Sequence, residues 1–149
     1  MFNRQLSLLA FLGLLLPGIA QGEQFETFGE YIVHYNAVGT SMLTPEVAKA
    51  YKLIRSKNRA LLNIAVRKKD SSSSMQDSAV TANVEVSIKN LLGQLRNVDM
   101  KEIREDSAIY YIGVFRITDQ EIINFNVQVT PELRGETRTV KFQQQFFID

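Results

Sequence analysis

The sequence predicts an all-β domain, an immunoglobulin-like β-sandwich of about seven strands with one short helix after the first strand. Apolar residues recur at every second position over most of the chain from Phe25 onward, which is typical of half-buried strands. Only one segment has helical spacing, so strands and helices do not alternate as they do in a doubly wound α/β sheet. The turns between successive strands are short. A closed β-barrel is the alternative.

The first strand is followed by the helix. From Phe28 to Ala37 apolar residues occupy both faces of the strand, with Tyr31 on one face and Phe28 on the other. Thr44 is a good N-cap, and Pro45 suits the first helical position. Because apolar residues then recur at helical spacing, we expect a helix over residues 45 to about 53.

The other strands continue the same alternation. They are expected at residues 59–67, 79–89, 94–105 (clearest from Met100), 108–117, 123–129 and 140–148. Strand 108–117 is apolar on both faces, as expected of a central strand, and it places Tyr110 and Tyr111 on opposite faces. Residues 105–107 and 118–120 are expected turns, and residues 68–78 and 131–137 are expected loops.

The C-terminal strand is rich in aromatic residues and poor in charge, so it would aggregate if it were left unpaired. We therefore expect it inside the sheet of its own domain, with Phe142 and either Phe146 or Phe147 in the core.

The N-terminus has the three parts of a cleaved secretory signal peptide. Arg4 gives a short positive region, residues 6–16 are apolar, and small residues follow Pro17 at cleavage spacing. The apolar run is shorter than the roughly 20 residues of a membrane-spanning helix. The expected organisation is a signal peptide over residues 1–20, with cleavage as late as residue 22, and a single domain over residues 21–149. The expected location is the periplasm.

Charge and cysteine content narrow the class of protein. Removing Arg4 with the signal leaves 16 basic and 16 acidic residues, where the full chain has 17 and 16. A near-neutral chain argues against a nucleic-acid partner and against binding to an anionic membrane. The absence of cysteine excludes both a lipoprotein anchor and disulfides. No second stretch is long enough to span a membrane.

Catalytic and metal-binding signals are lacking. His34 is the only histidine, and without cysteine a zinc or copper site has few ligands to use, so we expect no metal and no cofactor. No Gly-x-Ser-x-Gly motif presents a nucleophile, and no glycine-rich loop would hold a phosphate. A pair of carboxylates meeting in space remains open, because sequence spacing does not reveal it. We therefore predict no catalytic residues.

One local cluster is a candidate binding patch. Arg55, Lys57 and Arg59 follow the helix, and His34 and Asn36 lie on the strand before it. Such a patch would grip a carboxylate, a phosphate or an acidic partner surface. The competing interpretation is a solvated helix end, where cations are favourable beside the negative pole of the helix dipole.

Several segments of the chain resemble one known family. They are YIVHYNA at 31–37, LTPEVAKAY at 43–51, RSKNRALLNI at 55–64, LLGQ at 91–94 and AIYYI at 108–112. They are similar to a family of small bacterial exported proteins that is defined as a domain of unknown function. The resemblance implies an extracytoplasmic, immunoglobulin-like sandwich and implies no activity.

These observations favour a non-enzymatic module that binds an envelope protein or a peptide. A small-ligand binder, with its site between the helix and the sheet, is the alternative. A hydrolase that uses a pair of carboxylates is a third and weaker hypothesis.

Overall fold

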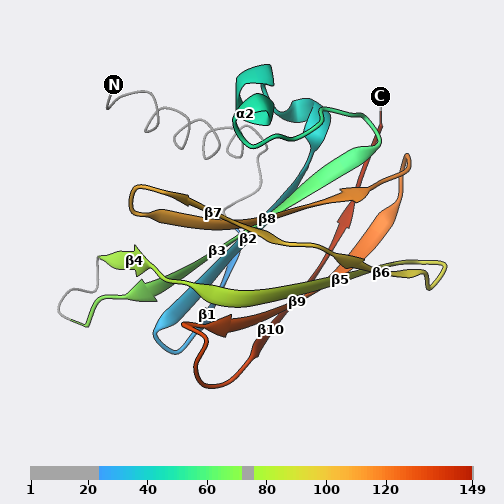
Figure 1. Ribbon diagram of the computed structural model, residues 1–149. Coiled ribbons are helices and arrows are strands. Elements are labelled where there is room, and N and C mark those ends of the chain that lie inside the picture. Colours follow the sequence, from blue (N-terminus) through green and yellow to red (C-terminus); the bar gives the residue numbers. More distant parts are fainter. Residues whose placement is uncertain (1–23, 72–75, 149) are drawn as a thin grey trace.

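Two antiparallel sheets pack face to face in the computed structural model, which describes residues 24–71 and 76–148 (Figure 1). Sheet A has the order β1 (Phe25–Phe28), β2 (Tyr31–Gly39), β3 (Arg59–Lys69), β8 (Ala108–Arg116) and β7 (Lys101–Glu105), and β4 (Asp77–Ala79) pairs with the far end of β3. Sheet B has the order β10 (Arg138–Gln145), β9 (Ile122–Pro131), β5 (Ala82–Asn90) and β6 (Leu95–Val98). The predicted all-β sandwich is confirmed. The barrel alternative is wrong, because each sheet ends in edge strands over the described residues.

The described chain has more strands than predicted, because three expected segments are each divided in two. A turn at Gly29, with φ of +59°, separates β1 from β2, so Phe28 pairs with Tyr31 and packs with it against one core rather than on the opposite face. Segment 79–89 breaks after β4, where the chain leaves sheet A for sheet B. Segment 94–105 breaks between β6 and β7, where it returns. Alternation does not reveal these crossings, since both sheets face the same core.

The return crossing depends on one glycine. A Cβ at Gly113 of β8 would lie 2.5 Å from Sδ of Met100, 2.6 Å from Cγ1 of Val98 and 2.9 Å from the backbone oxygen of Asp99. Real Cβ atoms do not approach so closely, so only glycine lets the crossing segment lie directly against β8.

The main core fills the space between the sheets. The inward residues of β3 are fully buried, as the alternation predicts: Ala60, Leu62, Ile64 and Val66. The C-terminal strand β10 pairs antiparallel with β9 over its whole length. Phe142 stacks on Phe125 with ring centroids 4.4 Å apart. Phe146 is 4% exposed and Phe147 is 67% exposed, so the prediction that one of the two would join the core is confirmed.

A second, smaller core lies on the outer face of sheet A, beneath α2 (Pro45–Ala50) and the preceding 3-10 turn η1 (Thr40–Met42). Thr44 caps α2 as predicted, its Oγ1 accepting the N–H of Val47 at 3.3 Å. The helix ends earlier than expected because Lys52 takes a left-handed conformation, with φ of +56°, and the N–H of Leu53 bonds back to the oxygen of Ala48 at 2.7 Å. This is a Schellman cap, which satisfies the last carbonyls and stops the helix.

No helix among the described residues is long and apolar enough to cross a membrane. The predicted signal peptide and residues 72–75 of the expected loop 68–78 lie outside the described residues.

Candidate functional site

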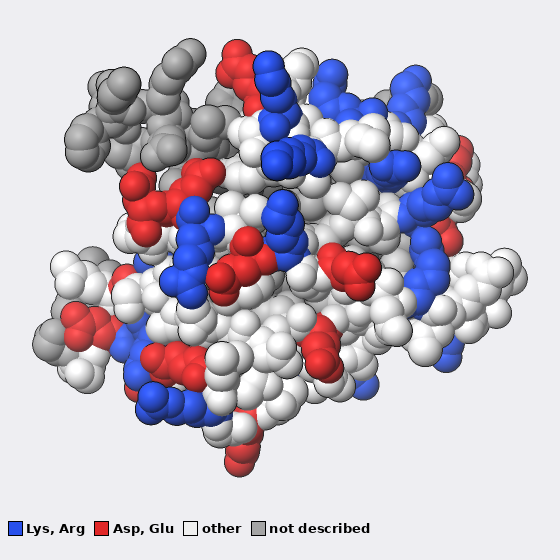
Figure 2. Space-filling view, viewed as in Figure 1, with Lys and Arg blue, Asp and Glu red and all other residues white. Residues whose placement is uncertain are grey.

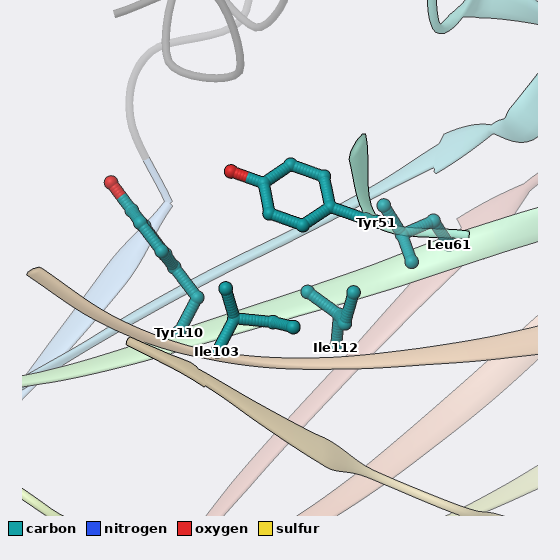
Figure 3. A pocket seen from close by; sticks show the side chains of 5 residues that line it. All are labelled: Tyr51, Leu61, Ile103, Tyr110 and Ile112. Atoms are coloured by element: carbon teal, nitrogen blue, oxygen red, sulfur yellow. The ribbon is translucent and has the colours of Figure 1, made fainter. Parts of the chain in front are cut away.

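A narrow apolar groove lies on the outer face of sheet A beside the end of α2 (Figure 3). Its floor consists of Leu61 from β3, Ile103 from β7 and Ile112 from β8, and its walls are the rings of Tyr51 and Tyr110. The groove encloses about 210 Å³ of space, part of it open to solvent, and is too narrow to hold a water molecule. It is therefore a narrow, partly open crevice between packed side chains.

Local structure positions the two tyrosines. Tyr51 is the C-cap residue of α2, so the Schellman cap that ends the helix also fixes the direction of its ring. Tyr110 faces outward because the alternation of β8 turns its neighbour Tyr111 into the main core. The prediction that Tyr110 and Tyr111 lie on opposite faces is confirmed.

Three buried polar atoms on this side of the molecule have no hydrogen-bond partner. Within residues 24–71 and 76–148 they are the hydroxyl of Tyr51, Oδ1 of Asn63 and Oε2 of Glu105. Asn63 lies opposite Ile112 in the strand register, and Glu105 lies two residues beyond Ile103 on the same face of β7. Leaving a buried polar atom unpaired costs about 1–3 kcal/mol, so each of these atoms favours the approach of a further polar group.

The electrostatics of the groove keep the phenols neutral. Burial raises the pKa of Tyr51, and the nearby carboxylate of Glu105 raises it further, by its charge and as a hydrogen-bond acceptor within reach of the phenol. Burial likewise raises the pKa of Tyr110. Tyr51 therefore offers a hydroxyl donor at neutral pH, while Glu105 and Asn63 offer acceptors, all beside an apolar floor.

The predicted basic patch divides into two groups. Arg55 is anchored to the backbone, its Nε donating to the oxygen of Leu43 at 2.7 Å and its Nη2 to the oxygen of Ser41 at 3.3 Å. Lys57 lies exposed in the turn before β3, and Arg59 opens β3 directly opposite Arg116 of β8. Arg55 thus holds the segment that leads into α2.

The remaining two residues of the patch lie farther along sheet A. The ring of His34 lies 5.8 Å from that of Phe25, between centroids. Asn36 pairs directly with Asn63, which places it beside the groove. Arg59 lies next to Ala60, which pairs with Gly39 of β2. Gly39 is three residues, or about 10 Å, from Asn36 along β2. The structure therefore brings Asn36, rather than the cations, to the groove, and ligand binding by the patch stays a prediction.

A second, shallow depression lies over sheet B and is lined mainly by polar side chains of β5, β6 and β9, among them Ser87, Asn97 and Asn126. No buried unpaired atom of the described chain lies there. Over the same residues, no group of three or more His, Cys, Asp or Glu side chains is arranged to hold a metal ion.

Sequence reasoning missed Tyr51, which lines the groove, and the two polar residues Glu105 and Asn63 on the strands beside it. Tyr51 has the spacing of an ordinary apolar helix residue, Glu105 has the position of a solvated turn residue, and Asn63 carries no pattern at all. The adjacent pair Tyr110–Tyr111 was the one available signal, because it requires one aromatic ring on an outer face.

The fold and the groove define a small two-sheet β-sandwich protein with an aromatic-walled surface site. Residues 25–149 match the model of the family described as a domain of unknown function, DUF4426, and the chain belongs to that family. The predicted resemblance to a family defined as a domain of unknown function is thereby confirmed.

Solved structures agree with this assignment. A DUF4426 family protein from Pseudomonas aeruginosa PAO1 is 32% identical, with a TM-score of 0.72 over 87% of this chain and 98% of its own. FetP from uropathogenic Escherichia coli strain F11, expressed in the periplasm, has a TM-score of 0.62 at 8% identity over 85% of this chain and 94% of its own. Its copper-bound E46Q variant has the same score at 7% identity, with 85% and 95% covered. At such identities these two show the fold alone. No curated protein matches the chain.

Proposed function

We propose that the protein is an exported, non-enzymatic module that binds a peptide or a segment of an envelope protein in the groove beside α2. The observation that carries the proposal is an unpaired buried atom on Tyr51, which lines the apolar groove, together with unpaired buried atoms on Asn63 and Glu105 of the adjoining strands. A bound segment would satisfy these atoms with its own donors and acceptors and would cover the apolar floor at the same time.

The shape of the groove favours a segment of protein over a small molecule. Pockets for small molecules are concave and enclose most of the ligand, whereas this groove does not hold even one water. Tyrosine is enriched at protein interfaces because its ring is large, rigid and apolar while its hydroxyl remains polar. Tyr51 and Tyr110 have that arrangement here, one on each side of the floor.

Export forms the other half of the proposal. Its support is the charged, apolar and small-residue order of the N-terminus, which is typical of a cleaved signal peptide. The sandwich of FetP, a protein expressed in the periplasm, is a compatible fold, although the low identity limits the comparison to architecture.

The variant Tyr51→Phe tests the site, because it should weaken binding of the partner without lowering the stability of the free protein. In the free protein it removes an unpaired hydroxyl, so the free energy of unfolding should stay equal or rise by up to about 1 kcal/mol. Capture of the partner by the tagged protein, after cross-linking in intact cells, should fall, as it should for Glu105→Gln. Phe147→Ser serves as the control, since Phe147 is exposed and does not line the groove.

Two results would contradict the proposal. One is a Tyr51→Phe protein that is clearly less stable, which would mean that the hydroxyl has a structural partner. The other is an unchanged set of cross-linked partners in both groove variants.

A further inference from the structure

The tip of the β5–β6 hairpin presents three leucines to solvent. Leu91, Leu92 and Leu95 expose 68%, 86% and 66% of their surface. Single exposed leucines are ordinary, but three within five residues at the end of one hairpin form an apolar tip that the core does not use. In Figure 1 this hairpin projects from the sandwich beside β9 and β8.

The tip has a fixed shape. Oδ1 of Asn90 accepts the N–H groups of Leu92 and Gln94, each at 3.0 Å, and Nδ2 of Asn90 donates to Oε1 of Gln94 at 2.7 Å. Gly93 closes the turn with φ of +84°, a conformation in which other residues are strained. The leucines are therefore held outward by a built turn.

Basic side chains surround the base of the tip. Lys89 pairs with Leu95 across the hairpin, and Nη1 of Arg96 donates to the backbone oxygen of Arg116 at 3.0 Å. Arg59 lies directly opposite Arg116, and like charges in that position repel. In the described part of the chain none of these four cations forms an ion pair with a carboxylate. Figure 2 shows several Lys and Arg side chains, with a few Asp and Glu among them, beside the uncharged projection.

We propose that this hairpin docks the protein on the surface of an anionic phospholipid bilayer. The leucines enter the boundary between headgroups and acyl chains, and the four cations of the base face the lipid phosphates. Charge complementarity selects this occupant, because an apolar tip with more cations than carboxylates at its base matches an apolar layer bounded by anions. The near-neutral mature chain predicted no such attraction, but the fold brings four cations to this end of the sandwich, where Asp119 and Glu121 of the β8–β9 loop offset only part of their charge.

The test is sedimentation of the purified mature chain with vesicles of phosphatidylglycerol and phosphatidylethanolamine, compared with vesicles of phosphatidylcholine alone. We expect binding to the anionic vesicles that weakens as salt rises. Combined Leu91→Ser, Leu92→Ser and Leu95→Ser should reduce the partition coefficient by about tenfold or more. Combined Lys89→Gln and Arg116→Gln should reduce it by about tenfold. Leu133→Ser is the matched control, since Leu133 is also 68% exposed but lies in the β9–β10 loop, and it should bind like the wild type.

The proposal is overturned if the wild type ignores anionic vesicles, if it binds phosphatidylcholine equally well, or if the leucine variant binds like the wild type. It is also overturned if the leucine variant keeps vesicle binding and loses a cross-linked protein, because the tip would then contact a protein instead. All the substituted side chains are exposed, so each variant should keep the fold. Thermal unfolding of each variant checks this.

Discussion

The hydroxyl of Tyr111, on β8 of sheet A, accepts a hydrogen bond from the backbone N–H of Ala82, on β5 of sheet B, over 2.8 Å. The same hydroxyl donates to Oε1 of Glu102 on β7 at 2.9 Å. One side chain thus satisfies a backbone group at the point where β5 enters its sheet, and it links the two layers of the sandwich.

Replacing Tyr111 should show how much its hydroxyl contributes to the free energy of unfolding. Tyr111→Phe leaves the N–H of Ala82 buried without an acceptor, so we expect the free energy of unfolding to fall by about 1–3 kcal/mol. Urea denaturation measures the loss. Tyr110→Phe, on the opposite face of the same strand, should cost clearly less, and equal losses in the two variants would contradict the role of the bond.

The adjacent phenylalanines near the C-terminus should respond very differently to truncation. Phe146 contacts Phe115 edge to face with ring centroids 5.7 Å apart, whereas Phe147 points to solvent. Phe146→Ala should cost about 3–5 kcal/mol and Phe147→Ala less than about 0.5 kcal/mol, as measured by thermal or urea unfolding. A large loss for Phe147→Ala would mean that it is the core residue of the pair.

A methyl group at Gly113 should disturb the crossing between β6 and β7. Gly113→Ala places a carbon against Val98, Asp99 and Met100, and the expected overpacking cost is about 1–3 kcal/mol. The double variant Gly113→Ala with Met100→Ala removes the nearest atom and should recover part of the loss. Unfolding curves of the two proteins make the comparison. No loss in the single variant would show that the crossing segment moves freely.

Acid should weaken a contact between the sheets. The hydrogen bond from Tyr31 and then the ammonium of Lys68 lower the pKa of Glu132 below its ordinary value of 4.5. The unfolded chain therefore binds a proton more readily, so this contribution to stability is present above pH 4.5 and is lost as the pH falls through the lower pKa of the folded state. Glu132→Gln should be less stable than the wild type at neutral pH, and the difference should vanish in acid. Chemical denaturation across this pH range tests it, and a difference that grows in acid would reverse the sign.

Export makes a direct prediction about the mature N-terminus. Mass spectrometry of protein from the periplasmic fraction should find a chain that begins at Gln21 or Glu23. A stable species in the cytoplasm that retains Met1 would remove the proposed compartment.

The sequence predicts best those features of the fold that depend on a single segment of the chain. The alternation of β3 depends on one chain segment, and Ala60 to Val66 are buried as expected. The crossings between the sheets at residues 80–81 and 99–100 were missed because they depend on which partner a strand chooses, while the apolar spacing continues unchanged through them.

The groove was harder to predict than the core. Its residues come from the end of α2 and from β3, β7 and β8, so they meet only after long-range pairing. The basic character of Arg55 was visible in the sequence, but the carbonyl oxygens of Ser41 and Leu43 that occupy its guanidinium were not. Side-chain partners of this kind are set by tertiary structure.

The side chain of Gln144, near the end of the chain, donates to the backbone oxygen of Ala37 in β2 at 3.0 Å, while β10 itself completes sheet B. The last strand therefore completes sheet B and also contacts β2 of sheet A. Under the proposed export, the sandwich would lack these contacts until β10 had crossed the membrane, so folding is expected to follow the translocation of β10.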